Sequence, residues 1–126
     1  MGWHKEVGTM AKYAVLGGYT AEAWEKMIEN PGDRTAAVRK VVEAVGGRLE
    51  QFYWSFGEDD YLVIIEAPDD VAAGAFSVAV GSSGSLRNLR TIKLITADEG
   101  RKLLEKAKAG KGTYVPPGER QPAGVR

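Results

Sequence analysis

The stretch RLEQFYWSFGEDDYLVIIE, residues 48–66, predicts two antiparallel strands joined by a short acidic turn. In its first half the side chains alternate across an extended chain, with three aromatic residues on one side, Phe52, Trp54 and Phe56. Leu49 and Tyr53 fall on the other side. Glycine and three acidic residues then reverse the chain, and the run YLVIIE returns beside the first strand.

The segments around this hairpin add one strand at each end and the helices that connect them. Before it, the pattern predicts a strand over 11–18, a short helix after Thr20 and an amphipathic helix capped by Asp33. After it, a helix follows Asp69 and a strand covers 86–95. The order β-α-β-β-α-β predicts an α+β, ferredoxin-like domain, with a four-stranded antiparallel sheet and both helices on one face.

The length of 126 residues, 44% of them hydrophobic, suits a single domain with one core. We expect this domain to occupy residues 10–109, including a C-terminal helix that the capping box Thr96–Glu99 starts. Residues 1–9 are interpreted as a flexible N-terminal extension. Residues 110–126, rich in Pro, Gly and charge, are interpreted as a disordered or extended tail.

The strands are apolar on both sides, which is unusual for a sheet with helices on one face only. The run Tyr61-Leu62-Val63-Ile64-Ile65 lacks the polar alternation that a solvated face requires. Which of Val63 and Ile64 faces the helices stays open, because both are apolar. An apolar face of this size exceeds what monomers usually expose, so we expect a second copy of the chain to cover it by two-fold pairing. The sequence therefore predicts a homodimer or a higher homo-oligomer.

The composition narrows the functional classes. The 17 basic and 17 acidic residues balance, so no net charge attracts nucleic acid or an anionic membrane surface. Cysteine is absent and the single histidine, His4, lies in the N-terminal extension, which disfavours thiol, Ser-His-Asp and zinc chemistry. No apolar run approaches the roughly 20 residues that cross a bilayer. We expect a cytoplasmic protein with no cofactor or metal and no nucleic-acid or membrane partner.

Several short strings resemble the GYD domain family of small bacterial and archaeal proteins. They are KYAVLGGYT at 12–20, GGRL at 46–49, and GEDD at 57–60 leading into VIIEAPDD at 63–70. Gly57 and Asp60 match the family's Gly-Tyr-Asp signature, whereas the signature tyrosine falls at Asp59. The resemblance covers about residues 11–97. It implies a dimeric α/β barrel and points to no particular reaction.

Three aromatic residues and one arginine are the candidate ligand-binding residues, Tyr19, Trp24, Trp54 and Arg90. The short helix that carries Trp24 is expected to leave a cleft against the sheet, where a small organic molecule could bind. Strand alternation predicts that Arg87 and Lys93 share one face of the fourth strand and that Arg90 lies on the other as a polar anchor.

Two functions remain open from the residues alone. The first is a non-catalytic oligomeric module that binds a small ligand or another protein. The second, implied by likeness to dimeric α/β-barrel enzymes, is a cofactor-independent monooxygenase or isomerase in which Tyr19 or Asp60 moves protons. A catalytic Asp60 would need burial to raise its pKa, and the acidic turn is expected to be solvated. This expectation favours the first function, and it also disfavours a cation site at the turn.

Overall fold

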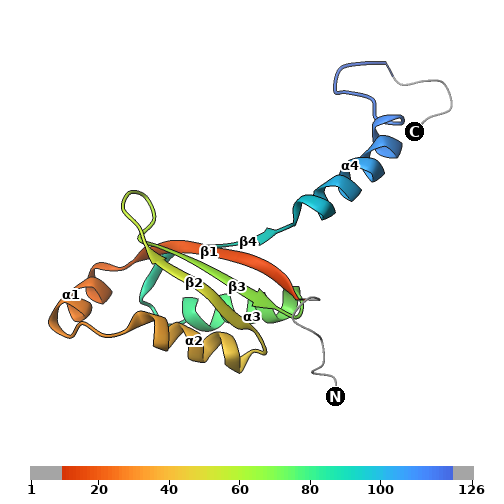
Figure 1. Ribbon diagram of the computed structural model, residues 1–126. Helices are drawn as coiled ribbons and strands as arrows, with labels where there is room; N and C mark the ends of the chain where they lie inside the picture. The colour runs from red at the N-terminus through yellow and green to blue at the C-terminus, as the bar shows by residue number, and fades with distance from the viewer. Residues whose placement is uncertain (1–9, 121–126) are drawn as a thin grey trace. The chain divides into compact units, whose positions relative to one another are not determined.

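The computed structural model describes residues 10–120, and its elements follow the predicted order (Figure 1). They are β1 (Ala11–Tyr19), α1 (Ala21–Glu29), α2 (Arg34–Ala44), β2 (Arg48–Trp54), β3 (Tyr61–Ala67), α3 (Asp70–Gly81), β4 (Leu86–Leu94) and α4 (Ala97–Lys111). The chain divides into two compact units, with the boundary between Leu94 and Ile95. The sheet belongs to the first unit, and α4 belongs to the second.

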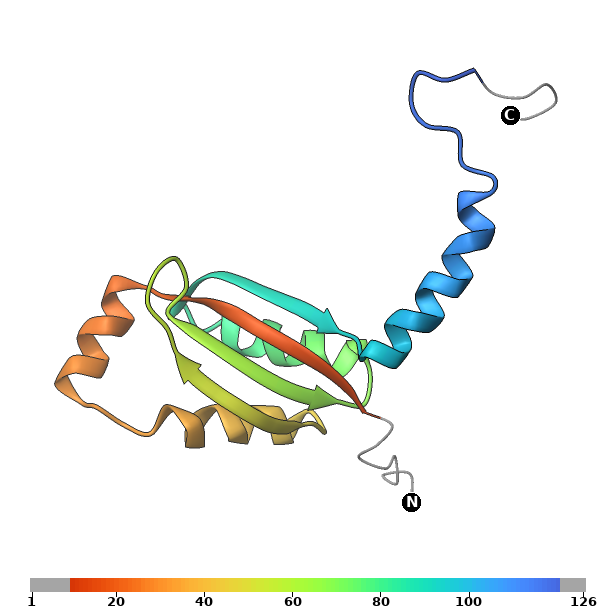
Figure 2. The same ribbon diagram turned by 45° about the horizontal axis from the view of Figure 1, so that its top comes forward.

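The strands of the first unit form one antiparallel sheet in the order β2-β3-β1-β4. Helices α2 and α3 lie on the same face of this sheet, α2 along β2 and α3 along β4 (Figure 2). The opposite face carries no helix of this unit. The arrangement confirms the predicted α+β, ferredoxin-like fold.

The core lies between the sheet and its two helices. Val15 of β1 pairs with Val63 of β3, and both are buried in one cluster with Val42 of α2 and Phe76 of α3. Burying a side chain of this size contributes about 1.5–3 kcal/mol, so these contacts hold the helices on the sheet. Because neighbouring strand residues point to opposite faces, Ile64 lies on the helix-free face, which resolves the alternative left open above.

Two irregularities in the sheet change the faces predicted from simple alternation. The pairing of β2 with β3 shifts between Leu49 and Gln51, so Leu49 turns to the helix side and joins the core with Phe52. The prediction that Leu49 and Phe52 lie on opposite sides is therefore wrong. The pairing of β1 with β4 shifts in the same way beside Asn88, whose φ is 51°. A bulge adds one residue to one strand and so reverses the alternation beyond it.

The predicted helix starts are confirmed by their caps. The side chains of Thr20, Asp33 and Asp69 accept hydrogen bonds from backbone N–H groups in the first turns of α1, α2 and α3. In the second unit, Thr96 and Glu99 form the predicted capping box, and α4 continues to Lys111. No helix among residues 10–120 combines the length and the apolar character needed to cross a membrane.

The turn between α2 and β2 needs a glycine at one position. A Cβ atom built on Gly47 would lie 2.5 Å from the carbonyl oxygen of Glu66, well inside normal contact. Glu66 is a residue of the neighbouring strand β3, and its backbone cannot move aside without disturbing the pairing of β3 with β2. Gly74 in α3 is the opposite case, because a Cβ there meets no atom within 4 Å.

These two glycines predict stability changes of opposite sign. Gly47→Ala should lower the free energy of unfolding by about 1–3 kcal/mol, because the new methyl group forces the backbone of β3 to shift. Gly74→Ala should raise it by roughly 0.5–1 kcal/mol, because alanine loses less conformational freedom in a helix. Urea denaturation of both variants measures the difference. A Gly47→Ala protein as stable as the wild type would mean that the turn does not press against β3.

Candidate functional site

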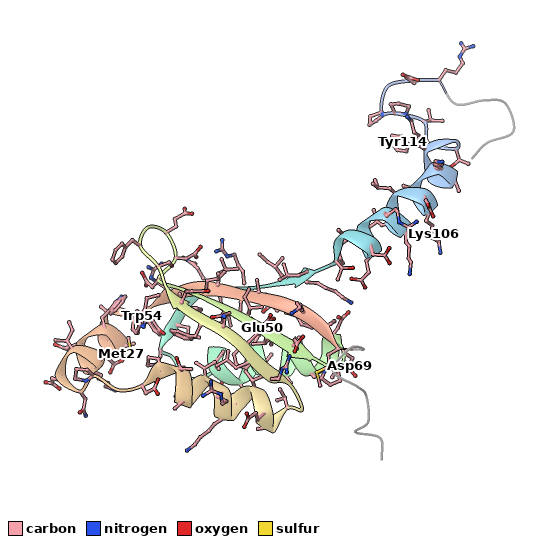
Figure 3. All side chains as sticks on the ribbon, viewed as in Figure 1. Met27, Glu50, Trp54, Asp69, Lys106 and Tyr114 are labelled. Atoms are coloured by element: carbon pink, nitrogen blue, oxygen red, sulfur yellow. The ribbon has the colours of Figure 1, made fainter. Side chains whose placement is uncertain are left out.

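An aromatic cluster forms where the end of β1 meets α1. The ring of Tyr19 lies 5.2 Å from that of Trp24, 5.7 Å from that of Trp54 and 5.2 Å from that of Tyr61, measured between centroids. Trp24 and Trp54 are themselves 5.7 Å apart. Figure 3 shows Trp54 beside Met27, at the junction of β2 and α1. The structure thus brings together three of the four residues predicted to bind a ligand.

A cavity of about 270 Å³ opens next to this cluster, between the sheet and helices α2 and α3. Its walls are mainly apolar and come from β1, β3, both helices and the start of β4, with Val15, Val38, Val63, Phe76, Val80 and Leu89 among them. Tyr19, Tyr61 and Arg34 add polar groups to this lining. A largely apolar cavity with a few polar groups is typical of a small-molecule site, and this one lies near the lower end of the usual size range.

The two predicted tryptophans line a second, smaller hollow of about 170 Å³ under α1. Arg34 is the residue that lines both spaces, because it begins α2 directly after the loop from α1. The cleft expected beside the Trp24 helix is therefore present. The larger cavity lies deeper, and Tyr19 is the predicted residue that reaches it.

Two polar atoms at the cavity are buried without a hydrogen-bond partner among residues 10–120. They are the hydroxyl oxygen of Tyr61 and the Nε of Arg34. Tyr61 as a whole is only 4% exposed. Leaving a buried donor or acceptor unpaired costs about 1–3 kcal/mol, so these two atoms are expected to meet a water molecule or another bound group.

The two tyrosines of the cavity keep their protons at neutral pH. Burial raises the pKa of Tyr61 to about 12, and the nearby Tyr19 hydroxyl adds to the rise. Burial also raises the pKa of Tyr19, while the Arg34 guanidinium beside its hydroxyl opposes that rise. Both phenols therefore keep an O–H that can donate a hydrogen bond, and Arg34 lies beside the Tyr19 hydroxyl.

The glycine pair before Tyr19 makes room on both faces of β1. A Cβ atom on Gly17 would lie 2.5 Å from the Tyr61 hydroxyl oxygen, on the cavity side. A Cβ atom on Gly18 would lie 2.5 Å from the guanidinium carbon of Arg87, on the opposite side. Side chains at either position would displace one of these groups.

Arg90, the fourth predicted ligand-binding residue, lies on the helix-free face and does not line the cavity. It pairs with Leu16, whose neighbours Val15 and Gly17 point to the helices, and its guanidinium forms an ion pair of 2.6 Å with Asp59. The bulge at Asn88 puts Arg87 on the same face as Arg90 and leaves Lys93 on the other, where it meets Asp70. The prediction that Arg87 and Lys93 share one face of the strand is wrong for this reason.

The acidic turn is solvated only in part, with Glu58 exposed as expected from the sequence and Asp60 held against the sheet. The Asp60 carboxylate is only 13% exposed, accepts a hydrogen bond of 2.9 Å from the Tyr19 backbone N–H, and lies 3.2 Å from Arg87. Asp60 therefore fixes the backbone at Tyr19, and it is not among the residues that line the cavity. Gly57, the other signature residue, has a φ of 115°, a conformation that favours glycine.

Sequence reasoning missed Arg34 and Tyr61 as site residues. Tyr61 was visible only as the first apolar residue of a strand, and Arg34 only as the residue after a helix cap. No local pattern distinguishes a buried Nε from an exposed one, because its burial depends on β2 and α1 closing over it. Within residues 10–120 no group of three or more potential metal ligands comes together.

Comparison with known proteins adds one match. The sequence profile of the GYD domain matches residues 13–104, which is most of the chain and reaches seven residues beyond the resemblance noted from the sequence. The match includes the first part of α4. No curated protein matches the chain.

The unpaired Tyr61 hydroxyl predicts an unusual response to its removal. Tyr61→Phe should leave the free energy of unfolding unchanged or slightly higher, because no hydrogen bond within the protein is lost. Tyr13→Phe is the matched control, since the buried Tyr13 hydroxyl donates to the Asp70 carboxylate at 2.6 Å and its loss should cost about 1–2 kcal/mol. Thermal and urea unfolding compare the two. Equal losses would show that Tyr61 has a partner in the folded chain.

Proposed function

The chain belongs to the GYD domain family, and from this premise and the geometry of the cavity we propose that it is a homo-oligomeric domain that binds a small, largely apolar molecule. The ligand occupies the space of about 270 Å³ between the sheet and helices α2 and α3. The observation that carries the proposal is the pair of unpartnered polar atoms, on Tyr61 and Arg34, at the wall of that cavity.

The lining of the cavity supports a ligand on energetic grounds. An apolar space of this size forgoes the dispersion contacts that side chains would make if the helices closed fully on the sheet. The unpaired Tyr61 hydroxyl adds the cost of a buried polar group. A molecule with an apolar body and one polar end offsets both costs at once. Neither cost would be offset by a partner that docks only on the outer surface.

The alternative, a cofactor-independent monooxygenase or isomerase, has less support from the same residues. Asp60 is held by Arg87 and the Tyr19 backbone and does not line the cavity. Tyr19 and Tyr61 have raised pKa values and hold their protons at neutral pH, so neither is suited to act as a general base. The groups at the cavity are suited to donating hydrogen bonds, which favours binding over proton abstraction.

The helix-free face supports the homo-oligomeric part of the proposal. Leu16, Leu62 and Ile64 form an apolar centre on this face, and Ile92 of β4, 46% exposed, extends it. Ion pairs lie at both ends of this centre, Lys12 with Glu50 at one end and Arg90 with Asp59 at the other. Since these charges are already paired within the chain, an apolar surface is the fitting partner, and a second copy supplies one by two-fold symmetry.

Blocking the cavity tests the ligand proposal. Val80 lines it, whereas Val78 on the same helix is 72% exposed, so Val80→Phe and Val78→Phe add the same side chain inside and outside. Titration with small aromatic probes such as benzamide and phenylacetamide, followed by protein NMR, should shift cavity signals in the wild type and in Val78→Phe. Val80→Phe should weaken binding at least about tenfold. A wild-type protein with no shifts at cavity residues contradicts the proposal.

Charges placed on each sheet face test the oligomer. Ile64→Asp should give a folded protein of lower mass, because Ile64 points away from the helices. Val71→Asp, at a residue of α3 that is 81% exposed, should leave the mass unchanged. Val63→Asp should unfold the domain, since Val63 is 3% exposed in the core. Size-exclusion chromatography with light scattering measures the mass. A wild type that is monomeric at micromolar concentration would refute this part of the proposal.

A further inference from the structure

We infer that the molecule bound in the cavity is an organic anion, a small carboxylate whose charged end meets Arg34 and the Tyr61 hydroxyl while its apolar body fills the space toward Phe76 and Leu89. This inference rests on the proposed function and names the class of ligand that the site would select.

Arg34 differs from Arg39 and Lys40, the exposed basic residues of the same helix, because it is half-buried at the cavity wall. On the helix-free face, Lys12, Arg48, Arg87 and Arg90 each form an ion pair with a carboxylate of the same unit. Arg34 has a buried Nε that meets no acceptor among the described residues. A guanidinium is always charged, and a charge among apolar walls is stabilised chiefly by an opposite charge. The cavity wall therefore presents a positive charge that lies beside the Tyr19 hydroxyl and forms no ion pair with a carboxylate of the described residues.

The nearest acidic residue in the sequence does not meet this need. Asp33 uses its carboxylate to cap α2, where Oδ1 accepts from the backbone N–H groups of Thr35 at 3.0 Å and Ala36 at 3.4 Å. The cap therefore occupies the N–H groups of Thr35 and Ala36, so these two are not available to a ligand. Recognition of an anion at this wall consequently depends on the Arg34 side chain.

The two tyrosines complete a donor set for a carboxylate. Tyr61 offers an unpartnered O–H at the cavity wall, and Tyr19 lies beside Arg34 with its ring 5.2 Å from that of Tyr61. A carboxylate has two oxygens that accept several hydrogen bonds and fit the planar guanidinium. An amide of the same shape offers one acceptor oxygen and no charge, so it gains less at the same place. A cation would be repelled.

The opposite walls set the shape of the ligand's body. Val15, Val63, Phe76 and Val80 give apolar contact on the sheet and helix sides. The volume of about 270 Å³ is sufficient for a small body such as one ring or a short branched chain. The ligand class is therefore a monocarboxylate with one aromatic or branched aliphatic group.

Matched acid and amide pairs test this inference on the full chain. The pairs are benzoate with benzamide, phenylacetate with phenylacetamide, and isovalerate with isovaleramide, titrated at neutral pH and followed by NMR and calorimetry. At least one acid should bind the wild type about tenfold or more tightly than its amide. In Arg34→Gln the preference should fall to within about twofold while the amide still binds. Arg39→Gln, an exposed arginine of the same helix, should keep the wild-type preference.

Each outcome separates the inference from the proposal beneath it. If acids and amides bind the wild type equally well, the cavity is a small-molecule site and the anion inference is wrong. A preference that survives in Arg34→Gln also overturns the inference, because the charge would then come from elsewhere. If neither acids nor amides perturb cavity residues, the proposed function itself fails. The comparison of acids with amides on the wild type needs no variant. If Arg34→Gln folds poorly, Arg34→Lys is the second variant, because lysine keeps the positive charge.

Discussion

The backbone at Gly17 and Gly18 approaches its neighbours on both sides, and the rest of the site depends on that approach. The missing side chain of Gly17 gives the Tyr61 hydroxyl its place on the cavity face. The missing side chain of Gly18 lets Arg87 lie across the strand on the other face, where it meets Asp60. Asp60 in turn binds the backbone N–H of Tyr19, and its own N–H donates to the Gly17 carbonyl at 2.7 Å. The hairpin turn, the end of β1 and the aromatic cluster are thereby fixed as one assembly.

As a result, charged side chains are arranged differently on the two faces of the sheet. On the helix-free face, basic groups are paired with carboxylates that the same sheet supplies, such as Arg90 with Asp59. Partly exposed pairs of this kind contribute little stability, about 0–1 kcal/mol each, but they leave an apolar centre with no unpaired charge around it. On the cavity face the polar groups are fewer, and the Tyr61 hydroxyl and the Arg34 Nε have no hydrogen-bond partner among residues 10–120. The first face is suited to a flat apolar contact and the second to a small molecule with an apolar body and one polar end.

The order of helices and strands could be predicted from the sequence, because local signals mark where each one begins and ends. These signals are helix caps, glycines and alternating apolar residues. Asp33 and Thr96 show this, since the caps predicted from them are present in the structure. The faces of strands were less predictable, because a single extra residue reverses them and leaves no fixed signature. The bulge at Asn88 moved Arg87 to the face of Arg90 for this reason. Tyr19, Trp24 and Trp54 could be grouped from helix and strand ends, whereas Arg34 could not, because its burial arises only when α1, β2 and α2 meet.

The position of Arg34 also explains how the domain can be stable before a ligand arrives. As the first residue of α2 it lies at the rim, so the side chain is only half buried although its Nε is enclosed. The partial exposure of Arg34 and the Tyr19 hydroxyl beside its guanidinium both lower the cost of its charge. A fully buried arginine would require its counterion for folding, and a fully exposed one would gain little from a ligand. In the proposed role, the intermediate burial of Arg34 allows the domain to fold without a counterion and leaves a free energy gain for an anion that binds beside it.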